Sequence, residues 1–283
     1  MRAVWRVAFF VLAVIAASAF STAIVYGLLS ATPLVSRARE LGVPTSEWLQ
    51  VVTMVVATYA SLRIVDGARF DVWSRVGLGV GALRIRSLGI GLIAGTAAIL
   101  GPSALLLAVH GFSFEPQATT VSWWSATGSA LLILVPAAIA EELTVRGYLL
   151  TALIDGLGRV PAVIVTSILF ALLHLLNPDP SVLSTLVVGL AGVFLATVRL
   201  TTNSLWAAVV AHLAWNLVQA VALHAPVSGL PLPTPGYRLV DRGPAWLTGG
   251  SWGPEGGLAA ALGMTVATFL LVRSTRKPVE IQA

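Results

Sequence analysis

"PAAIAEELTVRGYLL" (residues 136–150) carries two adjacent glutamates and an arginine, Glu141, Glu142 and Arg146, inside a long apolar run. An ionised side chain surrounded by hydrocarbon loses much of its hydration free energy, so it pairs with another charge, faces water or takes part in chemistry. The stretch therefore predicts a membrane-spanning helix with a charge cluster that serves a specific purpose.

The composition of the whole chain predicts an integral membrane protein. Of 283 residues, 57% are hydrophobic and 10% are charged, and the mean hydropathy is +0.90. The absence of cysteine excludes disulfides, thiolate metal sites and a cysteine nucleophile. Lys277 is the only lysine and lies in the C-terminal tail, which excludes a Ser/Lys dyad within the membrane. The net charge of +5 indicates topology and attraction to anionic lipid, and we expect no nucleic-acid partner.

Apolar runs of about 20 residues, the length that crosses a bilayer, predict an all-α fold, a polytopic transmembrane bundle of about eight helices. The predicted helices span 7–30, 48–65, 87–110, 124–152, 160–176, 182–200, 203–224 and 257–273. We expect three parts: N-terminal transmembrane helices with an arginine-rich cytoplasmic loop (1–120), a helical core (121–224), and a Pro/Gly-rich loop with a final transmembrane helix (225–283).

The basic residues predict the orientation of these helices. With the N-terminus inside, thirteen lysines and arginines fall on the inner side and four on the outer side, so both termini are predicted to be cytoplasmic. Alternatively, residues 1–19 are a signal peptide, because Arg2 and Arg6 precede an apolar stretch and "ASA" resembles a cleavage site. The arginine-rich, cysteine-free composition fits GC-rich bacterial coding and predicts a bacterial cytoplasmic membrane as the location.

Few ionisable side chains lie deep within the predicted spans. Of twelve acidic residues only Glu141 and Glu142 do so, and of four histidines only His174 and His212. With a rise of about 1.5 Å per residue, Glu141, His174 and Asn216 lie at a similar depth on three different helices, with His212 about one turn away. We therefore expect these polar side chains to meet in one cavity.

Helical spacing assigns the glutamates different directions. Glu142 and Arg146 are four residues apart, the favourable order for an ion pair, whereas Glu141 projects about 100° away from Glu142. Gly91 and Gly95 in "GIGLIAG" share one helical face, a small-residue pattern that predicts close packing between helices.

These residues can support hydrolysis of an amide. A glutamate in a poorly solvated pocket can act as a general base, so Glu141 with His174 can activate water, while His212 and Asn216 donate hydrogen bonds to the oxyanion. Glu141, His174 and His212 can alternatively hold a divalent metal such as zinc, although the sequence has no HExxH pair.

Three ordered motifs carry a family resemblance. "EELTVR" (141–146), "FALLH" (170–174) and "HLAWN" (212–216) resemble EExxxR, FxxxH and HxxxN of the CAAX-protease and bacteriocin-processing (CPBP) family, also known as Abi. The resemblance, which covers roughly residues 124–220, implies an intramembrane endopeptidase that cuts a peptide or membrane protein within or beside the lipid bilayer. It also implies the catalytic roles given above for Glu141, His174, His212 and Asn216, with Glu142 and Arg146 organising the site.

Alternatives remain at this point. Some relatives are described as metalloproteases and others as glutamate-dependent enzymes without metal, so the resemblance leaves the cofactor open. A non-proteolytic scaffold or immunity protein of the same family, or a transporter, would also carry buried charges. "GGSWG" at 249–253 satisfies a serine-hydrolase pattern but lies in a glycine-rich loop, which argues against that chemistry. Neither the oligomeric state nor the substrate is indicated.

Overall fold

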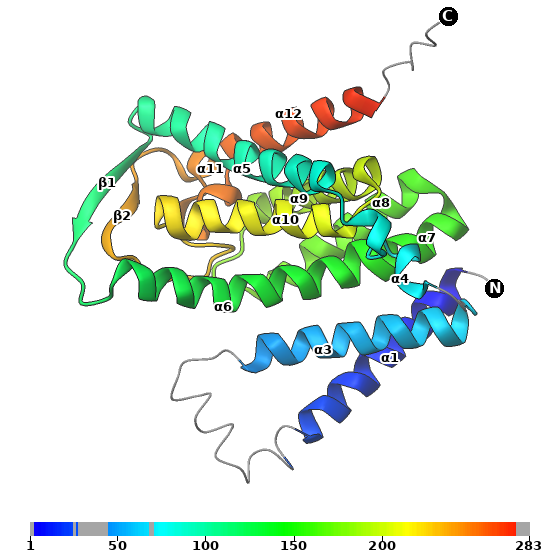
Figure 1. Cartoon of the computed structure of the whole chain (residues 1–283). Helices are drawn as coiled ribbons and strands as arrows, with labels where there is room; N and C mark the ends of the chain where they lie inside the picture. Colours follow the sequence, from blue (N-terminus) through cyan, green and yellow to red (C-terminus); the bar gives the residue numbers. More distant parts are fainter. Residues whose placement is uncertain (1–2, 25–26, 28–44, 68–70, 276–283) are drawn as a thin grey trace, which may run out of the picture.

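The computed structural model describes residues 3–24, 27, 45–67 and 71–275, and these form the predicted all-α bundle (Figure 1). Within them seven helices are long and apolar enough to cross a membrane, and one shorter apolar helix follows near the C-terminus. The elements of the first half are α1 (Ala3–Ala23), α3 (Thr45–Ala60) with η2 (Ser61–Val65), α4 (Val72–Arg75), η3 (Val80–Ala82), α5 (Ile85–Ala108) and β1 (Phe112–Gln117).

The second half begins with one long helix of three parts and ends with α12. Its elements are α6 (Trp123–Glu142), η4 (Leu143–Leu149), α7 (Leu150–Leu157), α8 (Arg159–Leu173), η5 (His174–Leu176), α9 (Val182–Thr202), α10 (Leu205–Leu217), η6 (Val218–Leu223), β2 (Gly236–Asp241), α11 (Ala245–Thr248), η7 (Gly250–Trp252), η8 (Pro254–Gly256) and α12 (Leu258–Thr275). The segments η2, η4 and η6 are π-helical.

Helix boundaries differ modestly from the predicted ones. The helix predicted to end at residue 152 continues to Leu157 and stops at Gly158, whose φ of 83° breaks the helix. The first helix begins at Ala3 instead of residue 7, and the part predicted for 28–30 lies outside the described residues. These differences of a few residues leave the predicted order of helices intact.

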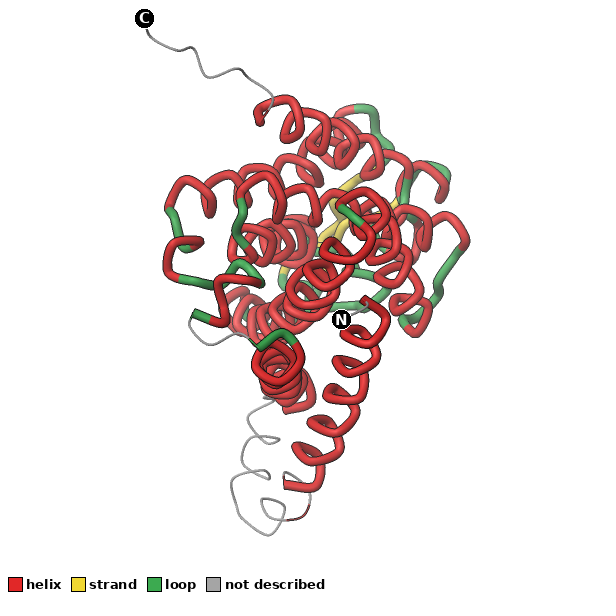
Figure 2. Tube along the Cα trace, turned by 90° about the vertical axis from the view of Figure 1, so that its right-hand side faces the viewer, coloured by secondary structure: helices red, strands yellow, loops and turns green. Residues whose placement is uncertain are grey.

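Helix α10 occupies the middle of the bundle. It packs against α5, α6 and α9, and α12 packs against α5 and α9 (Figure 1). Figure 2 views many of these helices end-on, with the α1/α3 pair extending below them. The largest hydrophobic cluster joins α5, α9, α10 and α12 and includes Ile99, Phe194, Trp215 and Met264. Side chains that project from α10 are therefore surrounded by other helices.

The two glycines singled out in the sequence make a close approach between helices α5 and α10. A Cβ added to Gly91 or to Gly95 would collide with the backbone carbonyl of Ala207 or Ala211 on α10. Only glycine allows α5 to pack at this distance, as small residues do in membrane helix pairs. The predicted packing role of these glycines is thus confirmed, and it fixes the position of the helix that carries His212.

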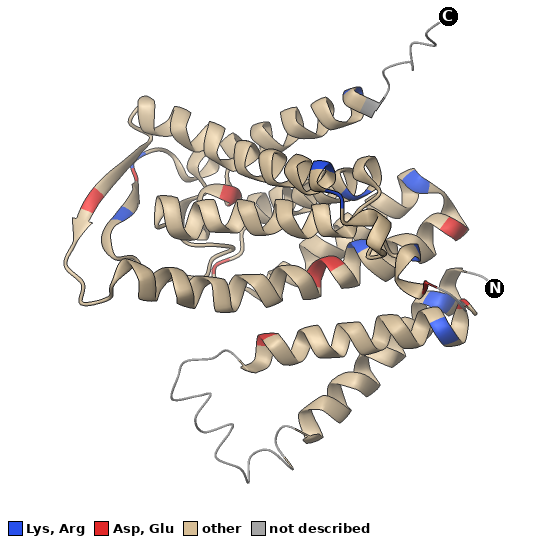
Figure 3. Ribbon diagram, viewed as in Figure 1, with Lys and Arg blue, Asp and Glu red and all other residues tan. Residues whose placement is uncertain are grey.

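A salt-bridge cluster fastens α1 to the bundle. Arg6 contacts Asp66 after η2 at 2.8 Å and Asp155 of α7 at 2.7 Å, and Arg75 of α4 also reaches Asp155, at 2.9 Å. Phe10 stacks on Tyr148 with ring centroids 4.9 Å apart. Figure 3 shows that most of the arginine segments lie at the end of the bundle where α1 begins.

A small sheet is the main element that the sequence did not predict. Strands β1 and β2 pair antiparallel, with Phe112 opposite Asp241. Glu115 of β1 forms ion pairs with Arg238 and Arg242 across this sheet. The segment predicted as a plain Pro/Gly-rich loop therefore contains a strand and several short helical turns that fold back against the bundle.

The helix contact at Gly95 gives a stability prediction. Gly95→Ala should destabilise the protein by about 1–3 kcal/mol, because the new methyl group collides with the α10 backbone. Gly89→Ala is the matched control, since a Cβ there has open space and alanine favours the helix. Thermal unfolding in detergent measures both, and an equal or higher midpoint for Gly95→Ala would contradict the close contact.

Candidate active site

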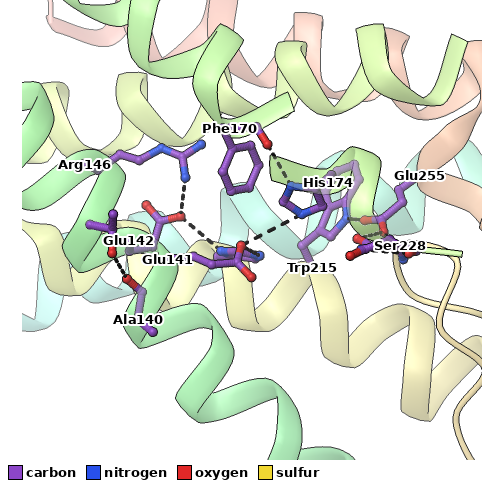
Figure 4. Close-up of polar contacts among 12 residues, drawn as sticks. Ala140, Glu141, Glu142, Arg146, Phe170, His174, Trp215, Ser228 and Glu255 are labelled. Carbon is purple, nitrogen blue, oxygen red and sulfur yellow. Dashed lines mark hydrogen bonds and ion pairs between the residues drawn. The ribbon is translucent and has the colours of Figure 1, made fainter. Parts of the chain in front are cut away.

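The three motifs converge within the bundle. Glu141 and Glu142 end α6, Arg146 lies in η4, and the FALLH and HLAWN residues lie on α8, η5 and α10. Figure 4 shows Glu141, Glu142 and His174 close together and the Phe170 ring between Arg146 and His174. The structure thus brings together side chains that the sequence places on three helices.

Glu142 and Arg146 form a fully buried ion pair. The Arg146 Nη1 donates to Glu142 Oε1 at 2.8 Å, and both side chains are 0% exposed. The guanidinium also lies over the Phe170 ring, with its central carbon 4.0 Å from the ring centroid. Aromatic faces attract cations, so the Phe170 ring stabilises the buried guanidinium in place of water. The ion pair predicted from the spacing is confirmed.

Glu142 has a second partner that the sequence did not predict. His212 Nδ1 lies 3.0 Å from the same Oε1 atom. A carboxylate paired with arginine accepts hydrogen bonds, so the Nδ1 of His212 is the protonated nitrogen in this contact. Glu142 therefore orients His212 on α10 as well as balancing Arg146, and it directs Nε2 of His212 toward Glu141.

His174 is held by its own helix. Its Nδ1 lies 2.8 Å from the backbone carbonyl of Phe170, and the two rings pack with centroids 4.5 Å apart. Because a carbonyl oxygen only accepts, Nδ1 carries the hydrogen and Nε2 is the available nitrogen. Any residue at position 170 would supply this carbonyl, so the contribution specific to phenylalanine is the packing of its ring against the imidazole.

Glu141 lies between the two imidazoles without touching either. Its Oε2 is 4.0 Å from Nε2 of His174 and 4.0 Å from Nε2 of His212. This oxygen is buried and has no hydrogen-bond partner among the described residues. A separation of 4.0 Å is too long for a direct hydrogen bond but suits a bridging water. The Glu141 side chain is 33% exposed, in contrast to 0% for Glu142.

The same three side chains fit a zinc ion poorly as they stand. Two ligands on tetrahedral zinc, each at about 2.0–2.1 Å from the metal, lie about 3.3 Å apart, whereas Glu141 is 4.0 Å from either imidazole. Among the described residues no group of three or more His, Cys, Asp or Glu side chains has a spacing suited to a metal ion. The donor geometry therefore favours a water molecule between Glu141 and the histidines.

A small cavity of about 30 Å³ lies beside His174 and His212 and adjoins this position. Its polar lining residues are His174, His212, Asn216, Ser228 and Glu255, and α9 and α12 supply apolar walls. Of the four side chains expected to meet in one cavity, Glu141 is not part of the lining and lies beside it, 4.0 Å from the two histidines. Asn216 makes no hydrogen bond to another described residue, so its amide is free to donate into the cavity. A substrate group that entered here would meet apolar side chains on one side and the histidines on the other.

Glu255 is a buried carboxylate that the sequence reasoning missed. It lies in η8, within the Gly/Pro-rich segment before α12, and is 8% exposed. Figure 4 shows it beside Trp215 and Ser228. The available signal was weak, because a glutamate in a glycine-rich loop is ordinarily solvated.

Residues 122–218 match the family model of type II CAAX prenyl endopeptidases, described as Rce1-like. This segment is Rce1-like. All three motifs lie within it, which confirms the resemblance drawn from them. No curated protein and no solved structure matches the chain. Glu255 and Ser228 lie outside the Rce1-like segment, although they line the same cavity.

The two adjacent glutamates should differ in their effect on stability. Glu142→Gln leaves Arg146 buried without a counter-charge, which should cost about 3–5 kcal/mol. Glu141→Gln removes no hydrogen bond within the described residues and should leave the thermal midpoint in detergent near that of the wild type. Equal midpoints for the two variants would contradict the separate roles of these side chains.

The donor geometry also predicts the response to zinc. Added zinc should not raise the thermal midpoint of the protein in detergent, because Glu141, His174 and His212 are too widely spaced to bind it without rearrangement. Pre-treatment with a chelator should likewise leave the midpoint unchanged. A zinc-dependent increase that Glu141→Gln abolishes would establish a metal site at these residues.

Proposed function

We propose that the protein is an intramembrane endopeptidase that hydrolyses a peptide bond in a membrane-associated protein or peptide. The observation that carries the proposal is the unpartnered Glu141 oxygen, 4.0 Å from two imidazole nitrogens and next to a cavity. The match of residues 122–218 to an endopeptidase family supports the same reaction class.

In the proposed reaction Glu141 acts as general base. It takes a proton from a water held between its Oε2 and Nε2 of His174, and the water oxygen bonds to the carbonyl carbon of the substrate amide. The resulting tetrahedral oxyanion then collapses, the C–N bond breaks, and the proton passes from Glu141 to the leaving amine. One water is consumed, and a carboxylic acid and an amine are produced.

His212 and Asn216 are proposed to stabilise the oxyanion. The Asn216 amide has free hydrogens, so it can donate in any protonation state. His212 already donates from Nδ1 to Glu142, and it can donate from Nε2 only when both ring nitrogens carry protons. Glu142, paired with Arg146, contacts Nδ1 of His212 and so fixes the orientation of the imidazole.

The substrate and the membrane are also proposals. The name of the matched family refers to prenyl-protein substrates, whereas the cavity described here supports only an apolar peptide segment beside the bilayer. We propose a bacterial cytoplasmic membrane with both termini in the cytoplasm. The gathering of arginines at the end of the bundle where α1 begins (Figure 3) supports this orientation.

Glu141→Gln should abolish proteolysis while the protein remains folded, because the amide cannot accept the proton from water. Mass spectrometry of membrane-protein termini compares cells that express the wild type or the variant at matched levels, and new termini should require Glu141. His174→Gln should reduce the same termini strongly.

The control is Glu47→Gln, a change at a glutamate on the exposed first turn of α3. It should leave every cleavage product in place. Identical termini in the wild type and in Glu141→Gln, at equal protein levels, would overturn the proposed protease function and would favour the scaffold or transporter alternatives.

A further inference from the structure

Glu255 accepts an unusual number of hydrogen bonds for a buried loop residue. Its Oε2 accepts from the indole Nε1 of Trp215 and, at 2.8 Å, from Nε2 of Gln219. Its Oε1 accepts from the backbone N–H of Ser228 and, at 2.7 Å, from the Ser228 hydroxyl. The backbone N–H of Glu255 in turn donates to Oε1 of Gln219 at 3.3 Å.

This pattern decides how Glu255 can act. Three of the four donors are N–H groups that can only donate, so both carboxyl oxygens serve as acceptors. Each oxygen already has two hydrogen-bond partners, which leaves little capacity for a substrate or an ion. Among the described residues no cation pairs with Glu255. The carboxyl group is therefore held by neutral groups of the protein, and it acts through them.

The donors on α10 and η6 lie beside the proposed oxyanion residues. Trp215 directly precedes Asn216, and Gln219 follows Trp215 by four residues, so Trp215 and Gln219 form a helical stripe next to that of His212 and Asn216. Fixing this stripe fixes the rotation of the helix about its axis. Gln219 lies in the π-helical turn that begins at Val218, where the helix changes from α to π geometry.

The other partner of Glu255 connects to the helix that carries His174. The Ser228 carbonyl accepts a hydrogen bond at 3.0 Å from Asn177, which lies three residues after His174. Gly229 N–H donates to the Trp252 carbonyl at 2.9 Å, which ties the same turn to the segment before Glu255. One carboxylate thus joins the loop after α8, the turn at Ser228 and the α10 helix.

We propose that Glu255 is a positioning residue for the protease site. It fastens Trp215 and Gln219 to the Ser228 turn, and this contact aims His212 and Asn216 at the cavity and closes the cavity's end. The inference rests on the proposed function, since it assigns Glu255 to the geometry of the same site. It also extends the functional site beyond the Rce1-like segment.

The kinetic test uses a substrate found from the Glu141-dependent termini. Glu255→Gln places an NH₂ group against the N–H donors of Trp215, Gln219 or Ser228 and so breaks part of the hydrogen bonding at Glu255. The resulting small misplacement of catalytic groups should lower kcat by about 100-fold. KM should stay near the wild-type value, because Glu255 has no free acceptor for substrate. Glu115→Gln, which changes an ion-paired carboxylate of β1, is the matched control and should keep wild-type kcat.

Trp215→Phe keeps the proposal testable if Glu255→Gln does not fold. It removes one donor to Glu255 but keeps an aromatic ring near Phe194, so kcat should fall about tenfold, the value of one hydrogen bond to a charged group. Trp246→Phe, at an exposed tryptophan of α11, should have no effect. Wild-type kcat in Trp215→Phe, or in a folded Glu255→Gln, would overturn the proposal.

A second measurement does not depend on proteolysis. The chain has no cysteine, so Ala191→Cys places a single thiol in the cavity wall. A small water-soluble thiosulfonate should modify this thiol several-fold faster when Glu255→Gln or Trp215→Phe is also present. If the wild type cleaves nothing, the proposed function fails, but the labelling rate still tests the role of Glu255. Equal labelling rates with and without Glu255→Gln or Trp215→Phe would overturn the positioning role of Glu255.

Discussion

The buried Glu142–Arg146 ion pair is the constraint on which the rest of the site depends. Neither charge is stable alone in an apolar bundle, because the desolvation of each is offset only by the other and by groups with matching geometry. The Phe170 ring covers the guanidinium and His212 donates to the same carboxylate oxygen. Satisfying one buried pair therefore sets the relative positions of η4, α8 and α10.

Local sequence properties account for what could be predicted. Apolar runs gave the helices and their order, and the four-residue spacing gave the pairing of Glu142 with Arg146, because both depend only on the periodicity of one helix. The His212 contact to Glu142 joins residues 70 positions apart. It depends on the rotation of α10, which is set by tertiary contacts such as the packing against Gly91 and Gly95 of α5 and has no local signature.

The features that escaped prediction lie in segments without periodicity. Strand β1, "FSFEPQ", is six residues long and contains proline, which ordinarily argues against a strand. It is stabilised by its partner β2, more than a hundred residues away, and by the ion pairs of Glu115. Glu255 is similar, because its environment is created by Trp215, Gln219 and Ser228. The sequence around it, rich in glycine, indicates only a loop.

The two adjacent glutamates project in different directions from one helix, so one can have a structural role and the other a chemical one. Successive residues of a helix differ by about 100° in direction, so Glu142 faces the closed interior while Glu141 faces His174 and His212, the histidines that line the cavity. His212 connects the two, with Nδ1 on Glu142 and Nε2 4.0 Å from Glu141. The Oε1 atom of Glu142 is occupied by Arg146 and His212, and the Glu142 side chain is 0% exposed, so this carboxylate is closed off from solvent. Two consecutive glutamates therefore allow one to be buried and paired while the other remains free to bind water beside the cavity.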